Sequence, residues 1–239
     1  MKRIFDLTFS LIGLIILIIP LGILMLIIWL SDFSSPLYIS YRVGVNGKKF
    51  RMFKLRSMIP NADRSGANST SLDDNRITWI GKIIRKYKFD EGMQLLNVFL
   101  GDMSFVGPRP NVVDETLTYT EKEKALFNIK PGITDFSSIV FSDEGDILEG
   151  SYDPDLDYNQ LIRPWKSRLG IIYIESQSFM LDIQIIFYTL IALTSKRTSL
   201  QWICRKLSEL NVNPRLISVA SRTKELYPYP PPGSNKTIE

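Results

Sequence analysis

The sequence predicts an α+β protein, mainly α, that is attached to a membrane. Three observations predict this class. Residues 7–30 form a run of 24 residues without a charge, and as a helix of about 36 Å this run could cover a hydrocarbon core of about 30 Å. Residues 36–58 alternate around a Gly-rich turn as a β-hairpin does. Apolar residues recur at helical spacing between Ile77 and Leu100.

The uncharged run has two features that bear on its topology. Pro20 lies inside it and removes a helical hydrogen bond, so we expect a kink or break there. Basic residues flank both ends: Lys2 and Arg3 before it, and a basic cluster from Arg42 to Arg56 after it. Because positive flanks favour the cytoplasmic side of a membrane, both ends of the run are expected on that side. A single span and a helix-break-helix hairpin both remain open on these grounds.

The remaining elements follow in order along the chain. The hairpin turns at Gly44–Gly47, and a polar loop over residues 60–75 precedes the helical region that ends at Gly101. Residues 115–128 indicate a charged, exposed helix. Residues 143–157, with seven acids and no Lys or Arg, read as a solvated loop.

The C-terminal third is apolar first and polar later. Residues 169–194 suit helices on a membrane surface or in a buried core. From residue 205 the chain becomes polar, and its Pro-rich end at residues 227–233 predicts a flexible or polyproline-like tail.

Composition limits the chemistry that the chain can perform. It has 239 residues, no His and one Cys, which excludes imidazole catalysis, an intrachain disulfide and a thiolate zinc site. A metal would therefore be held by oxygen, as Mg²⁺ prefers. The net charge of 29 − 25 = +4 is small for a nucleic-acid-binding surface.

Two short motifs carry candidate chemistry. Asp90 and Glu91 follow a basic run, and alone they read equally well as a charged helix start. Arg109 stands between Pro108 and Pro110, which fix its backbone and suit a guanidinium that binds phosphate; a solvent-exposed connector is the alternative. The basic cluster from Arg42 to Arg56 could bind lipid headgroups, nucleotide phosphates or nucleic acid.

Several short sequence blocks occur in a fixed order along the chain, and together they are more informative than any one of them alone. The blocks are Lys2-Arg3 with Asp6, Pro20 in an apolar run, Tyr41-Arg42-Val43-Gly44, Lys54-Leu55-Arg56-Ser57-Met58, Asp90-Glu91, Gly101-Asp102-Met103-Ser104 with Gly107-Pro108-Arg109-Pro110, and Lys130-Pro131-Gly132-Ile133-Thr134. Together they resemble the bacterial sugar transferase family, the monotopic polyprenyl-phosphate phosphoglycosyl transferases. The resemblance covers roughly residues 2–194.

The resemblance implies a reaction and a topology. Members of this family move sugar-1-phosphate from a UDP-sugar to a polyprenyl phosphate in the membrane, through a covalent phosphosugar-aspartate, and release UMP. Their membrane segment is a re-entrant helix-break-helix hairpin, which makes Pro20 the break and the protein monotopic with interfacial amphipathic helices. The family usually has Ser before this Pro, whereas this chain has Ile19.

The resemblance also assigns residues. Asp90 and Glu91 match the catalytic dyad, with Asp90 as nucleophile and both carboxylates holding Mg²⁺ as cofactor. Arg109, held by Pro108 and Pro110, contacts the nucleotide. The expected phosphate contacts are Lys54, Arg56 and Arg85.

The expected partners are a UDP-sugar, a polyprenyl phosphate and membrane lipids, with downstream glycosyltransferases and without nucleic acid. The expected location is the cytoplasmic face of the bacterial inner membrane, where the reaction would begin assembly of an exopolysaccharide, lipopolysaccharide or capsule. We expect three parts: the membrane hairpin (1–32), the catalytic domain (33–204) and the tail (205–239).

Two departures from the family pattern keep an alternative open. Gly92-Met93 replaces the Leu-Pro that usually follows the dyad, and Asp135-Phe136-Ser137-Ser138 follows Gly132-Ile133-Thr134. The alternative is a catalytically inactive, membrane-anchored relative that binds an assembly partner.

Overall fold

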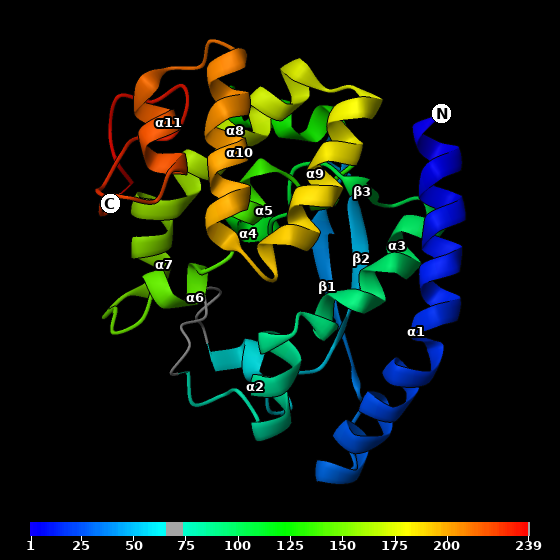
Figure 1. Ribbon diagram of the computed structural model, residues 1–239. Coiled ribbons are helices and arrows are strands. Elements are labelled where there is room, and N and C mark those ends of the chain that lie inside the picture. Colours follow the sequence, from blue (N-terminus) through cyan, green and yellow to red (C-terminus); the bar gives the residue numbers. More distant parts are fainter. Residues whose placement is uncertain (66–73, 239) are drawn as a thin grey trace.

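The computed structural model describes residues 1–65 and 74–238. It is mainly helical, with two small sheets, as the sequence predicts. A long N-terminal helix lies along one side, and the C-terminal helices lie on the opposite side (Figure 1). Half of the predicted polar loop, residues 66–73, lies outside the described residues.

The uncharged run forms one helix, α1 (Lys2–Asp32), with Pro20 inside it. Figure 1 shows that α1 is bent part way along its length, as a helix with an internal proline is expected to be. Its two halves do not fold back against each other, so the break expected at Pro20 is a bend within a continuous helix. In the part of the chain that the structure describes, α1 is the helix long and apolar enough to cross a membrane.

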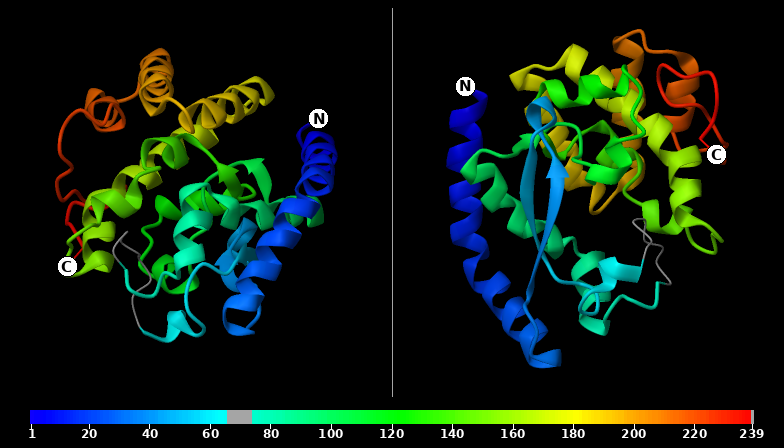
Figure 2. Two further views of the ribbon diagram at one scale, coloured as in Figure 1. Left: turned by 60° about the horizontal axis from the view of Figure 1, so that its bottom comes forward. Right: turned by 180° about the vertical axis from the view of Figure 1, so that it is seen from behind.

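The predicted β-hairpin is confirmed. Strands β1 (Leu37–Val43) and β2 (Lys49–Leu55) pair antiparallel, with Leu37 opposite Leu55 and Val43 opposite Lys49. Figure 2 shows from behind that the hairpin lies between α1 and the C-terminal helices.

The helical region from Ile77 to Leu100 is divided into three pieces. Helix α2 (Trp79–Lys86) begins at Thr78, whose hydroxyl accepts a hydrogen bond from the Gly81 amide. Lys88 then takes a left-handed backbone conformation (φ 58°) and starts the 3₁₀ turn η3 (Phe89–Met93), which runs into α3 (Gln94–Leu100). The periodicity predicted helix throughout and missed this interruption, which carries Asp90 and Glu91.

A second, parallel sheet brings together the sequence blocks that end at Pro110 and at Thr134. Strand β3 (Ser104–Val106) precedes the Pro108-Arg109-Pro110 motif, and it pairs with β4 (Gly132–Thr134). The backbones approach so closely here that a Cβ on Gly132 would lie 2.1 Å from the Gly107 nitrogen. Glycine is therefore required where the two blocks meet.

The exposed helix predicted at residues 115–128 is wrong. The segment holds α4 (Val113–Thr116) and a 3₁₀ turn, η4 (Glu123–Asn128). Glu123 is fully buried and forms an ion pair of 2.9 Å with Arg163. Local charge could not reveal a partner 40 residues away.

The solvated loop predicted at residues 143–157 is also wrong in part. It contains helices α6 (Glu144–Ile147) and α7 (Pro154–Asp157). Asp143 pairs with Lys196 and Arg222, and Glu144 pairs with Lys166. The acids of its first half therefore fix this segment to the helices around it.

The main core lies in the C-terminal half. Helix α5 (Phe136–Val140), a short π-helical turn η5 (Tyr158–Ile162) and α8 (Arg163–Ser176) pack with α9 (Phe179–Ala192). Helices α10 (Lys196–Glu209) and α11 (Pro214–Ala220) complete this core. The proposed boundary at residue 204 lies inside α10, and the three-part division stays a prediction.

Of the two expectations for the tail, flexible or polyproline-like, the flexible one is wrong. The ring of Tyr229 stacks on Trp165 with centroids 4.3 Å apart, and Gln160 donates a hydrogen bond to the Ile238 carbonyl. The C-terminal segment is therefore packed against η5 and α8.

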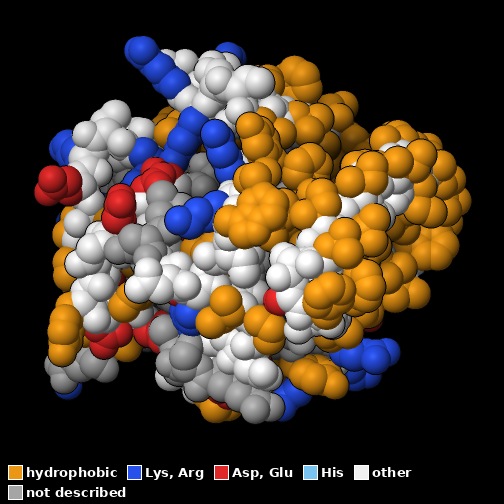
Figure 3. All heavy atoms as spheres, turned by 90° about the horizontal axis from the view of Figure 1, so that it is seen from below, with side chains coloured by type: hydrophobic (Ala, Val, Ile, Leu, Met, Phe, Trp, Pro, Cys, Tyr) orange, Lys and Arg blue, Asp and Glu red, His pale blue; other side chains and the backbone are white. Residues whose placement is uncertain are grey.

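Apolar side chains cover much of one side of the molecule. Figure 3 shows a broad hydrophobic surface next to a region where Lys and Arg side chains lie beside Asp and Glu. On α9 the exposed apolar side chains include Phe179, Met180, Phe187 and Leu190. Together with the exposed apolar residues of α1, they form a surface suited to contact with lipid.

Candidate active site

Asp90 and Glu91 occupy the 3₁₀ turn η3, between the end of α2 and the start of α3. This turn packs against β2. A short turn between two packed helices holds the carboxylates more firmly than a loop could, because both of its ends are fixed.

Asp90 is half-buried. Its Oδ1 atom is buried and, among the described residues, has no hydrogen-bond partner. Burial raises the pKa of the Asp90 carboxyl group, while the charges of Lys54, Arg109 and Arg85 act to lower it. An unpartnered carboxylate oxygen surrounded by cations is available to a ligand or to an electrophile.

Glu91 is tied to the proline-flanked motif. Arg109 donates from Nη2 to Glu91 Oε1 over 2.5 Å. Although burial would raise it, the pKa of Glu91 falls to about 2 because of the charges of Arg109 and Lys54. The pKa of Arg109 is raised by Glu91 in turn. The two motifs that the sequence singled out, 18 residues apart, thus meet in one site.

Two further predicted cations complete the site. Lys54, on β2, has a pKa lowered to about 8 by burial and by Arg109, against the opposing charges of Asp90 and Glu91. Arg85, near the end of α2, donates from Nε to Ser57 Oγ over 2.9 Å, and its charge also acts on Asp90. Three cations around two carboxylates leave one net positive charge, which suits an anionic substrate.

Arg56 does not join them. It is buried, and both of its terminal nitrogens donate to Asp32 at the end of α1, each over 2.6 Å. Its Nε donates to the Ser35 carbonyl. These contacts occupy the guanidinium and make Arg56 an anchor for α1, which differs from the expected phosphate contact.

Pro108 and Pro110 are buried on either side of Arg109. They line a narrow cavity together with Tyr119 and Phe127. The prolines thus hold the Arg109 backbone in place, and their contact with substrate stays a prediction.

The turn that carries the dyad also packs against α1. A Cβ built on Gly92 would lie 3.3 Å from Leu21 Cδ2 and 3.7 Å from Leu17 Cδ1. Gly92 therefore lets the turn approach α1 on both sides of Pro20, which places a charged site against an apolar helix. The Gly92 departure from the family pattern has a packing explanation.

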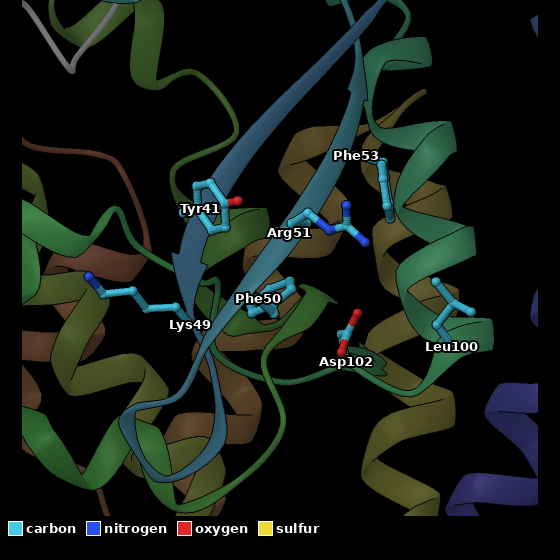
Figure 4. Close-up of a pocket in the computed structure, with 7 residues that line it drawn as sticks. All are labelled: Tyr41, Lys49, Phe50, Arg51, Phe53, Leu100 and Asp102. Atoms are coloured by element: carbon cyan, nitrogen blue, oxygen red, sulfur yellow. The ribbon is translucent and has the colours of Figure 1, made fainter.

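A larger pocket of about 440 Å³ lies elsewhere and does not include the dyad. Figure 4 shows that Tyr41, Lys49, Arg51 and Phe53 of the hairpin line it, with Leu100 and Asp102 opposite. Because side chains alternate along a strand, Arg51 and Lys54 belong to opposite faces of β2. The pocket and the site are on different sides of the hairpin.

The donor set fits Mg²⁺ in one specific way. No group of three or more Asp, Glu, Cys or His side chains gathers as a metal cage within residues 1–65 and 74–238. Mg²⁺ is commonly bound by one or two carboxylates together with substrate phosphates and water. The unpartnered Asp90 oxygen and the ionised Glu91 match that mode.

One site cation was missed as an individual residue. The sequence places Arg42 only within the basic cluster, yet its pKa is lowered by burial and by the neighbouring Arg109. Hairpin register could have found it, because Arg42 and Lys54 fall on the same face.

Fold and site together indicate a membrane-associated enzyme whose carboxylate pair lies among cations. The profile of the bacterial sugar transferase family matches residues 1–196. The sugar transferase EpsL of Bacillus subtilis is 33% identical over 79% of this chain and 85% of its own length. The exopolysaccharide production protein ExoY of Sinorhizobium fredii is 32% identical over 83% of this chain and 87% of its own.

An undecaprenyl-phosphate glucose phosphotransferase of Komagataeibacter xylinus is 36% identical over 79% of this chain, but over only 35% of its own length. The chain belongs to the bacterial sugar transferase family. Residues 197–239 lie outside the family match.

Proposed function

We propose that this protein transfers sugar-1-phosphate from a UDP-sugar to a membrane polyprenyl phosphate and releases UMP. The observation that carries the proposal is the position of the Asp90–Glu91 turn. It joins three cations to a carboxylate with a free oxygen, and it lies against α1 beside Pro20. A water-soluble diphosphate and a lipid phosphate could meet there.

In the first half-reaction, an Asp90 carboxylate oxygen attacks the phosphorus that carries the sugar. The bond from this phosphorus to the bridging oxygen breaks, and UMP leaves with both electrons of that bond. A phosphosugar remains on Asp90, so one difficult transfer becomes two easier ones. Lys54, Arg85 and Arg109 stabilise the charge on the phosphates.

In the second half-reaction, a phosphate oxygen of the polyprenyl phosphate attacks the same phosphorus. The Asp90 acyl-phosphate bond breaks, the carboxylate is restored, and the product is a polyprenyl diphosphate sugar. Mg²⁺ held by Asp90 and Glu91 would neutralise charge on the diphosphate when bound. This product would begin assembly of an exopolysaccharide, lipopolysaccharide or capsule, on which downstream glycosyltransferases would act.

The contacts of α1 support a re-entrant, monotopic topology. Lys2 donates to Asp182 over 2.7 Å at one end of the helix, and Asp32 binds Arg56 at the other. Both partners belong to the same folded domain. If α1 crossed the membrane, its two ends would lie on opposite sides and the domain could not bind both. With basic flanks at both ends, the domain belongs on the cytoplasmic face of the inner membrane.

The test is the first half-reaction alone. Purified protein in detergent is mixed with Mg²⁺ and UDP-glucose, UDP-galactose, UDP-N-acetylglucosamine or UDP-N-acetylgalactosamine, without any polyprenyl phosphate. We expect at most one equivalent of UMP and a matching gain of phosphosugar mass on the protein. Asp90→Asn should abolish both signals, because its amide is a poor nucleophile.

The control variant is Asp102→Asn, an exposed carboxylate in the pocket on the other face of the hairpin. It should keep both signals. If folded protein gives no UMP with any donor, even after undecaprenyl phosphate is added, the inactive, partner-binding relative becomes the better interpretation.

A further inference from the structure

A second polar cluster lies near Arg109. Arg42, near the end of β1, forms a β-bridge with Val112, the residue before α4. Helix α4 carries Glu115, and the charges of Arg42 and Glu115 act on each other's pKa. The cluster is therefore built where the hairpin meets the segment after Pro110.

Arg42 has more donors than partners. A guanidinium carries five N–H donors, and Arg42 makes one long side-chain hydrogen bond among the described residues, from Nε to Ser40 Oγ over 3.4 Å. Burial and the like charge of Arg109 lower its pKa. Arg42 is partly exposed, so its unused donors are open to water or to a ligand.

Glu115, in turn, has an acceptor atom without a donor among the described residues. Its Oε1 atom is buried and has no hydrogen-bond partner in the described part of the chain. The Tyr158 hydroxyl interacts with this carboxylate, and Lys166 lies over the Tyr158 ring. Burial raises the pKa of Glu115 to about 6, against the charges of Lys166, Arg163 and Arg42.

Arg42 and Glu115 nevertheless form no ion pair with each other, although the structure describes both residues. The Arg163–Glu123 pair shows what a saturated structural pair looks like in this same protein. Arg163 donates to both oxygens of Glu123 over 3.1 and 2.9 Å, and to Thr118 and Asn159 as well. Among the described residues, most donors of Arg42 and the Oε1 atom of Glu115 therefore have no partner.

We propose that Arg42 and Glu115 bind the hydroxyl groups of a ring of the nucleotide-sugar donor and so determine which donor is accepted. The inference rests on the proposed function, because it assigns a subsite to that donor. A hydroxyl accepts from Arg42 and donates to Glu115 at once. A phosphate would gain from Arg42 but would be repelled by Glu115, so the phosphates belong with Lys54, Arg85 and Arg109.

Hydroxyls of the sugar and of the ribose share this chemistry. A site built to hydrogen-bond a hydroxyl can reject the analogue without it by about 10⁴-fold. The proposal therefore predicts an effect on the choice between donors, which general destabilisation of the fold would not produce.

The experiment compares Arg42→Lys and Glu115→Gln with the wild type in the full-length protein with Mg²⁺ and undecaprenyl phosphate. The kcat/KM for UMP release is measured with the four UDP-sugars named above and with the 2′-deoxyribose analogue of the preferred one. We expect both variants to lose about 10²-fold with the preferred donor and to change its preference over another donor by at least tenfold.

Matched controls lie next to the tested residues. Asp114 is the exposed neighbour of Glu115, and Arg51 lies on the opposite face of the hairpin from Arg42. Asp114→Asn and Arg51→Ala should leave both the rate and the preference unchanged. A changed preference among sugars places the sugar in the subsite, and a lost preference for ribose over deoxyribose places the ribose there.

An equal loss with every donor overturns the inference. A binding measurement tests the subsite separately from the proposed reaction. The affinities of the same donors are compared between Asp90→Asn and the double variant Asp90→Asn with Glu115→Gln. If the wild type turns over no donor, the proposed function is wrong. An altered order of donor affinities in the double variant would still support the subsite. An unaltered order overturns it.

Discussion

Glu91 and Arg109 show how one contact can prepare a site. Their ion pair joins the turn η3 to the loop after β3, and it keeps the Glu91 carboxylate ionised despite burial. It also leaves Asp90 as the carboxylate with the raised pKa. Two adjacent acids thereby acquire different properties, which the sequence alone could not distinguish.

Lys54 should set the alkaline limit of activity. Its pKa is lowered to about 8 by burial and by Arg109, so it is charged below that pH and neutral above it. We expect kcat/KM for UMP release to fall as the pH rises through about 8. Lys54→Arg should keep its charge and move this fall to higher pH. Initial rates from pH 6 to 10 check this, and an unmoved alkaline limb in the variant would contradict it.

Gly132 should be the residue least tolerant of a methyl group. A Cβ there would lie 2.1 Å from one backbone atom of Gly107 and 2.6 Å from another. Gly132→Ala must separate β3 from β4, which should cost about 3 kcal/mol and lower the Tm by about 6–12 °C. Thermal unfolding in detergent measures this. Gly22→Ala is the control, because nothing lies within 4 Å of its Cβ, and an equal loss in both variants would refute the steric cause.

Among the elements, α1 is held at both ends by polar contacts. Besides bonding Asp182, Lys2 donates to the Val106 carbonyl and the Tyr173 hydroxyl, each over 2.9 Å. Arg3 donates to the last carbonyls of α3, at Val98 and Phe99. The helix is therefore an integral part of the domain that carries the site.

This arrangement predicts the sidedness of α1. A cysteine added ahead of Met1 and Ser35→Cys, each in a Cys204→Ser background, should both react with a membrane-impermeant thiol reagent from the cytoplasmic side. In intact cells neither should react from outside. Reaction of one of the two from outside would show a crossing helix and would remove the support that the Lys2 and Asp32 contacts give to the re-entrant topology.

Local elements could be read from the sequence, and distant partnerships could not. The hairpin was predictable because strand alternation and a Gly-rich turn are local signals. The interruption at Lys88 was not, because helical spacing continues through it on both sides. The family resemblance assigned Arg56 to phosphate, whereas Asp32, 24 residues earlier, is its partner. Of the predicted site, Asp90, Glu91, Lys54, Arg85 and Arg109 do come together.

At the scale of the whole molecule, the C-terminal segment completes the fold. Residues beyond the family match supply Leu200, Ile203, Leu207 and Leu216 to the main core. Polar composition concealed this role, because α10 and α11 present only one face to the core. The same segment then returns to the residues just before η4, where Thr120 donates to the Pro232 carbonyl.

The C-terminal segment should stabilise η5 and α8, which carry Tyr158 and Lys166. Tyr229 stacks on Trp165, its amide donates to the Gln160 carbonyl, and Arg168 lies over its ring. Tyr229→Ala removes the ring contacts with Trp165 and Arg168 and leaves the backbone hydrogen bond to Gln160 in place. We expect it to lose about 2–3 kcal/mol of unfolding free energy, and to lower the Tm by about 4–12 °C.

Tyr229→Phe separates the ring from the hydroxyl, which accepts a hydrogen bond from exposed Arg215. Because that bond lies at the surface, Tyr229→Phe should change the Tm by less than about 2 °C. Thermal unfolding of both variants beside the wild type decides the matter. If alanine is as harmless as phenylalanine, the segment only rests on the domain; if both are equally harmful, the Arg215 bond and not the stacked ring holds it in place.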